Sequence, residues 1–217
     1  MDRDTYALLG TLGYLLMLVG VVPFVGFTVI IAGFLLAGSA WSLMGLDYNK
    51  RIYTFLGVFM ALTPILGLII GLNLIASLMD LAIKVKYLSP TNPHIIFTLT
   101  AILTSMANSI TLLVLLFSIT LVIHVFSLLK AEKDTKIHLF KTSSLLTLVT
   151  LILFIAFIST LFYLLPGLSS LSASQVTFSL TINHLFIPIT LLALTVLFGV
   201  LSVISIALAF FELSESS

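Results

Sequence analysis

The sequence predicts an all-α fold, an integral membrane bundle of about six transmembrane helices with the N- and C-termini in the cytoplasm. The first observation is a run of seventy residues, 142–211, without Asp, Glu, Lys or Arg; three further charge-free runs cover 5–46, 52–79 and 87–129. The second is a composition of 60% hydrophobic and 8% charged residues. Soluble folds intersperse charges over their surface, whereas a charge at the centre of a bilayer costs about 2.5–3.5 kcal/mol.

The first two helices share the charge-free run 5–46, which is long enough for two spans of about 20 residues each. Pro23 and Gly26 mark the break between them, because proline ends a helix and glycine permits a tight turn. We therefore expect spans at 5–22 and 24–46, joined as a hairpin.

The third and fourth helices are longer than a bilayer requires. The third is expected at 51–72 with an extension to 86, and the fourth at 94–130, on either side of the turn-forming segment 89–93. Two arrangements are open: both helices project beyond the membrane as a hairpin, or each breaks into a span and an interfacial piece. Asn108-Ser109 is the expected place of such a break.

The last two helices come from the seventy-residue run. They are expected at 139–165, closed by Pro166-Gly167, and at 184–211, with an uncharged Ser/Thr-rich connection between them. The chain is thus predicted to form a single transmembrane domain, 1–217, since no segment is long and polar enough for a soluble domain beside it.

The orientation follows from the cations. With six spans, seven of the nine Lys and Arg residues fall on the side of the N-terminus: Arg3, Lys50, Arg51 and the four lysines of 130–141. Lys84 and Lys86 fall on the opposite side. Because cytoplasmic loops of membrane proteins are enriched in Lys and Arg, the basic side is predicted to be cytoplasmic.

The composition argues against several functions. The net charge of +1 argues against a nucleic-acid partner, and the absence of cysteine rules out disulfides, thiolate nucleophiles and Cys-ligated metals. The sequence also lacks the common hydrolase, metalloprotease and P-loop motifs. We therefore expect no enzymatic activity, no catalytic residues, no cofactor and no metal. The expected partners are the lipid bilayer and other membrane protein subunits.

His124 is the histidine placed well inside a predicted helix. One interpretation is a haem or metal ligand, or a station in a proton relay. A bis-histidine haem would need a second histidine at similar depth, but His94 and His184 lie at the opposite ends of their helices. The favoured interpretation is a neutral histidine that is hydrogen-bonded to a neighbouring helix.

Four residues are candidates for an intramembrane polar path: Asn73, Thr104, Asn108 and His124. The alternative is that such side chains form hydrogen bonds between helices, as polar residues in membrane bundles often do. Two small-x-x-x-small patterns, Gly33-x-x-x-Ala37 and Gly67-x-x-x-Gly71, are expected to let helices approach closely within the fold.

Three stretches carry a resemblance to a known family. They are Leu8-Leu9-Gly10-x-x-Gly13 with Val21-Val22-Pro23-Phe24-Val25-Gly26, then Phe126-x-Leu128-Leu129-Lys130-Ala131-Glu132-Lys133 with Leu139-Phe140-Lys141-Thr142, and the ending Ile206-Ala207-Leu208-Ala209-Phe210-Phe211. Together they resemble a family of small archaeal multi-pass membrane proteins of unknown function. The resemblance implies an archaeal plasma membrane and carries over no activity, cofactor or site residue.

Two functions compete. The expected one is a non-catalytic accessory or assembly subunit of a larger membrane complex, since the spans hold little chemistry and their apolar faces suit lipid and partner helices equally. The alternative is a small solute or ion transporter or channel, which would need the polar path described above to line up.

Overall fold

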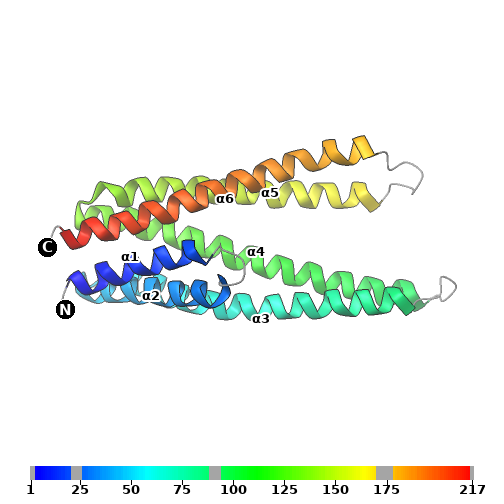
Figure 1. The fold of residues 1–217 in the computed structure, drawn as a ribbon, viewed down its shortest axis with the longest axis horizontal. Coiled ribbons are helices and arrows are strands. Elements are labelled where there is room, and N and C mark those ends of the chain that lie inside the picture. The colour runs from blue at the N-terminus through cyan, green and yellow to red at the C-terminus, as the bar shows by residue number, and fades with distance from the viewer. Residues whose placement is uncertain (1–2, 21–25, 88–93, 170–177, 216–217) are drawn as a thin grey trace.

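The computed structural model confirms the all-α helical bundle (Figure 1). It contains six helices in the part of the chain that it describes: α1 Arg3–Val19, α2 Gly26–Asp47, α3 Arg51–Tyr87, α4 His94–Thr135, α5 His138–Ser169 and α6 Phe178–Glu215. The structure describes residues 3–20, 26–87, 94–169 and 178–215, except the side chains of 27, 81, 84–87, 94–105, 161–169 and 178–185.

The six helices form a closed ring. Each helix packs against its neighbours in the chain, and α1 packs against α6. Both termini lie at one end of the bundle, together with the α2–α3 and α4–α5 connections (Figure 1). This end carries seven of the nine Lys and Arg residues, so the structure gathers them on one side as the sequence predicted.

The two connections at this charged end are tight. Asn49 and Lys136 adopt positive φ angles of 52° and 63°, which allow a helix to stop and the chain to reverse within a few residues. The Lys50 backbone N–H donates to the carbonyl of Gly45 at 2.9 Å, and the Lys136 N–H donates to Glu132 at 2.8 Å. These bonds satisfy carbonyls that the last turn of each helix leaves open.

The helices differ in length, and this divides the molecule in two. α1 and α2 have 17 and 22 residues, whereas α3 to α6 have 32 to 42. At 1.5 Å per residue, α1 is about 26 Å long and α4 about 63 Å. All six helices therefore surround the half next to the termini, which we name the basal half. In the distal half the pairs α3/α4 and α5/α6 diverge (Figure 1).

Five helices of the described chain are long and apolar enough to cross a membrane, over Thr28–Asp47, Arg51–Asp80, Met106–Thr135, His138–Thr160 and Phe186–Glu215. α1, with 17 residues, is at the lower limit of a span. Large apolar side chains are exposed along the whole bundle, from Leu8 near the charged end to Ile83 in the distal half. The protein is a multi-pass membrane protein whose outer surface contacts lipid.

Helix boundaries depart from the predicted spans mainly in the distal half. α3 and α4 are continuous helices, and α4 runs through Asn108-Ser109, so the unbroken arrangement is the one observed. α5 continues past Pro166-Gly167 to Ser169, and α6 begins at Phe178 rather than 184. Proline and glycine are tolerated in membrane helices, because the bilayer offers the backbone no water as an alternative partner. The turns predicted at Pro23 and at 89–93 lie outside the described residues.

Glycines bring the helices of the basal half into backbone contact. A Cβ added at Gly13 would lie 2.4 Å from the backbone nitrogen of Ala37 and 2.9 Å from the carbonyl oxygen of Gly33, so α1 and α2 meet with no room for a side chain. The Gly33-x-x-x-Ala37 pattern therefore packs within the fold, as predicted. For Gly67-x-x-x-Gly71 the expectation is wrong, because a Cβ at either glycine would have nothing within 4 Å among the described residues.

Candidate functional site

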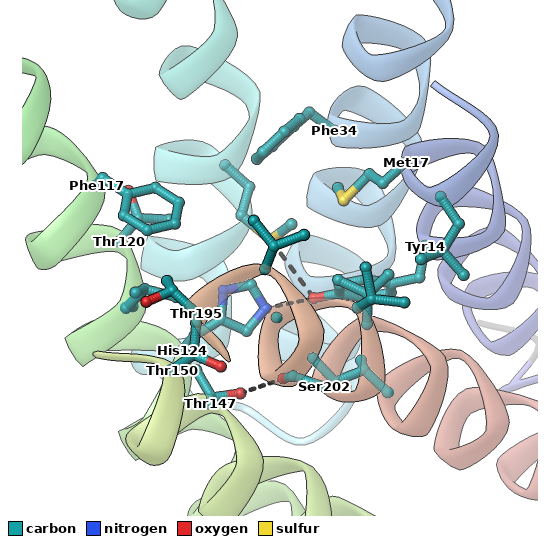
Figure 2. Close-up of a pocket in the computed structure, with 18 residues that line it drawn as sticks. Tyr14, Met17, Phe34, Phe117, Thr120, His124, Thr147, Thr150, Thr195 and Ser202 are labelled. Carbon is teal, nitrogen blue, oxygen red and sulfur yellow. Dashed lines mark hydrogen bonds between the residues drawn. The ribbon is translucent and has the colours of Figure 1, made fainter. Parts of the chain in front are cut away.

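A cavity of about 320 Å³ lies where the basal half meets the distal half (Figure 2). All six helices line it, and one residue of each shows the arrangement: Tyr14 of α1, Phe34 of α2, Met60 of α3, His124 of α4, Thr150 of α5 and Thr195 of α6. Tyr14 belongs to the second half of α1, whose helical residues end at Val19. The ring of helices thus leaves its central space unfilled just where the short hairpin α1/α2 stops.

The basal side of the cavity ends on a chain of buried hydrogen bonds. The indole Nε1–H of Trp41 donates to the hydroxyl of Tyr14 at 2.8 Å, and this hydroxyl is hydrogen-bonded to Nε2 of His124 (Figure 2 shows the second bond). The sulfur of Met60 lies 3.8 Å from the same hydroxyl. Three helices, α1, α2 and α4, are tied together by two bonds of this chain.

We assign the tautomer of His124 from the acceptor strengths of the groups around the Tyr14 hydroxyl. An indole N–H only donates, so the Tyr14 oxygen accepts from Trp41 and keeps its own proton to give. The imidazole Nε2 is a better and closer acceptor than the thioether of Met60, so Tyr14 donates to His124. A neutral ring that accepts at Nε2 carries its proton on Nδ1, and there it is a donor.

Trp41 lies at the centre of the aromatic side chains that pack beneath the cavity. Its ring centroid lies 5.6 Å from that of Tyr53, 5.2 Å from Phe210 and 6.2 Å from Phe140. These side chains are fully buried. With Tyr14 and His124, the single tryptophan thus contacts residues of all the other five helices. This aromatic cluster separates the cavity from the charged end.

Hydroxyl groups pair α5 with α6 beside the cavity. The hydroxyl groups of Ser143 and Ser205 are hydrogen-bonded at 2.8 Å. Those of Thr147 and Ser202 are 2.6 Å apart (Figure 2). The Thr147 proton is directed to the carbonyl of Ser143, so Ser202 is the donor to Thr147. Further from the charged end, Thr150 of α5 and Thr195 of α6 also line the cavity. The two hydroxyl pairs tie α5 to α6 beside the cavity.

The threonines of the cavity wall present oxygen atoms as acceptors. Thr120, Thr150 and Thr195 each donate to the carbonyl four residues earlier in their own helix, at 2.7, 2.9 and 2.7 Å. All three side chains are buried and line the cavity. A hydroxyl that donates in this way retains lone pairs, so each threonine can still accept a hydrogen bond.

Among the residues that line the cavity there is no Asp, Glu, Lys or Arg. Two carboxylates accept from buried tyrosines at the charged end: Asp47 accepts from Tyr6 at 3.0 Å, and Asp134 accepts from Tyr53 at 2.8 Å. These bonds anchor helix ends and lie beyond the aromatic cluster. An ion in the cavity would meet no compensating charge on its wall, and an unpaired charge in such a place is costly.

The cavity is not sealed, and most of its wall is apolar. Phe117 of α4 and Val196 of α6 line it and are 41% and 54% exposed, which places them at its rim. Phe117 packs edge to face against Phe154 of α5, with 4.7 Å between ring centroids. Because the outer surface at this level is apolar, the rim opens to the hydrocarbon of the bilayer.

Of the four residues predicted for a polar path, the structure places His124 at the cavity and does not bring the described ones together. Asn73 and Asn108 are exposed on the surfaces of α3 and α4, and the side chain of Thr104 lies outside the described residues. The His124 ring is hydrogen-bonded to the neighbouring α1, as in the favoured interpretation of the sequence. No group of three or more potential metal ligands occurs among the described residues.

Sequence reasoning missed Tyr14, Trp41 and the paired hydroxyl groups. Two signals could have found them. A tyrosine and a tryptophan in the middle of apolar spans need partners for their polar atoms when buried, so Tyr14 and Trp41 point to each other. Ser143, Thr147 and Thr150 recur at helical spacing, which predicts a hydroxyl stripe on one face of the helix.

Comparisons of the chain with models of protein families, with curated proteins and with solved structures gave no match.

Proposed function

We propose that the protein is a non-catalytic integral membrane protein whose central cavity binds an uncharged, amphipathic molecule drawn from the bilayer. The observation that carries the proposal is the cavity itself, which all six helices build and which opens to lipid. Its wall is apolar toward the rim and carries uncharged polar groups around His124. We infer from the basic residues at the basal end that this end faces the cytoplasm of a cell membrane.

The size of the cavity supports a head group as occupant. Ligand pockets run from about 300 to 1,000 Å³, and about 320 Å³ is at the low end of that range. A whole membrane lipid is larger than this space. An amphipathic molecule would place its polar end at His124 and leave its apolar tail at the rim, in contact with Phe117, Val196 and the surrounding lipid.

A role as accessory subunit of a larger membrane complex is the second candidate, and the unpacked Gly67-x-x-x-Gly71 face of α3 favours it. Both glycines leave open space, and this face lies in the distal half, where neither α1 nor α2 covers α3 (Figure 1). Small residues let a second helix approach closely in a membrane. A transport path receives no similar support, since it would have to pass Trp41 and Phe210, which are fully buried and pack edge to face.

One purification tests both candidates with two glycine variants. Gly199→Leu fills the cavity: its Cβ would meet the Thr150 Cγ2 at 3.7 Å, an ordinary contact, so the backbone need not move. The double change Gly67→Leu/Gly71→Leu fills the open space beside these two glycines of α3. Each preparation, in mild detergent from the expressing membrane, is analysed by native mass spectrometry for bound lipid and for co-purifying proteins.

We expect Gly199→Leu to lose a bound lipid-sized mass that the wild type and the double variant retain. If the subunit role holds as well, the double variant loses a protein partner that Gly199→Leu keeps. Equal lipid occupancy in Gly199→Leu and wild type would contradict the binding function. Recovery of the wild type only as a monomer or homo-oligomer would contradict the subunit role.

A further inference from the structure

His124 brings a hydrogen-bond donor to the cavity. Its ring is 7% exposed and lines the space, and Nε2 is occupied by Tyr14. The proton is therefore on Nδ1, and among the described residues that nitrogen has no hydrogen-bond partner. A ligand atom in the cavity that accepts from this N–H would therefore be favoured.

The threonines complement this donor. Three threonine hydroxyls donate hydrogen bonds to carbonyls of their own helices, so toward the cavity they act as acceptors: Thr120, Thr150 and Thr195. Turning one of these hydroxyls to donate into the cavity would break its bond to the helix. The site thus offers one N–H donor from α4 and acceptor oxygens from α4, α5 and α6.

We propose that the ligand is a lipid alcohol whose hydroxyl group binds between His124 and these threonines. A hydroxyl is the smallest uncharged group that accepts and donates at one atom: it accepts from His124 Nδ1–H and donates to a threonine Oγ1. An ether or a ketone can accept a hydrogen bond from His124 but has no proton to donate to the threonines. Carboxylate and ammonium heads would enter a wall that carries no Asp, Glu, Lys or Arg.

The hydrogen-bond chain beneath the ring strengthens the donor. Trp41 donates to Tyr14, and Tyr14 donates to His124, so both bonds polarise the imidazole in the direction of Nδ1. In return, an acceptor at Nδ1 alters the surroundings of Trp41, whose ring centroid lies 6.1 Å from that of His124. Since Trp41 is the single tryptophan of the chain, its fluorescence reports on the site without a label.

This proposal rests on the proposed binding function, and the test separates the two. The full-length protein in nanodiscs of fixed lipid composition is titrated with 2-bromohexadecan-1-ol and, separately, with its methyl ether, while bromine quenching of Trp41 is recorded. We expect saturable quenching by both probes, with about tenfold tighter binding of the alcohol, which is roughly the effect of one buried hydrogen bond. Gly199→Leu should abolish both signals.

The variants are read as the ratio of the alcohol and ether affinities, which is insensitive to a general change in Trp41 emission. His124→Phe should weaken the binding of both probes, because both accept from Nδ1–H, whereas Thr195→Val should bring the ratio close to one. Thr190→Val is the matched control, because Thr190 also donates to the carbonyl four residues earlier on α6 but is exposed to lipid. It should keep the tenfold preference.

A ratio of one in the wild type, with quenching that Gly199→Leu still abolishes, would overturn the lipid-alcohol proposal and leave the binding function standing. A preference that survives Thr195→Val, or affinities of both probes that stay unchanged in His124→Phe, would place the hydroxyl elsewhere and would also overturn the proposal. The absence of saturable quenching by either probe would overturn the binding function as well.

Discussion

The basal and distal halves are built from helices of similar apolar composition, but they pack in different ways. In the basal half six helices enclose Trp41, Tyr53, Phe140 and Phe210, all without exposed surface. In the distal half the same four long helices form two separate pairs, and side chains such as Ile69, Ile75 and Phe186 are more than half exposed. Hydrophobicity alone therefore places helices in the membrane but does not bring them together.

The difference follows from the membrane as a solvent. Lipid tails are as apolar as leucine, so close approach of helices depends on small residues and on hydrogen bonds. The basal half has both: Gly13 against Ala37, Gly57 against Gly38, and the Trp41–Tyr14 bond. Among the described residues, nothing lies within 4 Å of a Cβ built at Gly67 or Gly71 of the distal half. Three changes compare the two halves directly.

The largest expected effect is that of Trp41→Ala. Truncating a fully buried tryptophan that contacts the other five helices should lower the free energy of unfolding by about 3–5 kcal/mol. Phe186→Ala in the distal half is the control, since its ring is 67% exposed to lipid and should change stability by less than about 0.5 kcal/mol. Unfolding by SDS, followed by far-UV circular dichroism, measures both. Equal losses of unfolding free energy in the two variants would contradict the conclusion that the basal half supplies most of the stability.

The second-largest effect is expected when glycine is replaced by alanine at two positions, one in each half. Gly13→Ala places a methyl group 2.4 Å from the Ala37 nitrogen, so the α1/α2 hairpin must open, at about 1–3 kcal/mol. Gly67→Ala enters open space and should be neutral or slightly stabilising, because alanine favours helix over glycine by about 0.8–1 kcal/mol in soluble hosts. Thermal unfolding in the same detergent compares them. Similar midpoints for both variants would show that the close α1/α2 contact does not exist in solution.

Much of the fold could be predicted from the sequence because one property, the absence of charge, controls it. The runs 52–79 and 87–129 lie inside α3 and α4 apart from a few residues, and the basic segments around Arg51 and 130–141 lie at the end that holds the termini. The helix ends near Pro166 were harder to predict, since proline and glycine do not stop a helix as reliably in lipid as in water.

The site was less predictable, because it depends on which face of each helix turns inward. Depth along a helix follows from residue counting, so His124 was placed correctly inside its helix, but Asn73 and Asn108 turn outward on theirs. The partner of His124 is Tyr14, 110 residues away in the sequence, and no local pattern links the two. Their contact exists because the Gly13–Ala37 crossing and the α1–α6 packing close the ring.

The smallest effect concerns the hydroxyl pairs that hold α5 and α6 together at the cavity. A double-mutant cycle of Thr147→Val and Ser202→Ala should give a coupling energy of about 0.6 kcal/mol, the average for hydrogen bonds between membrane helices. The value is small because a separated hydroxyl in lipid can still bond to its own helix, as Thr147 does with Ser143. The same cycle between Thr147 and Thr190, which is exposed, should give no coupling. A coupling of similar size in both cycles would mean that the hydrogen bond between Thr147 and Ser202 does not hold α5 against α6 beside the cavity.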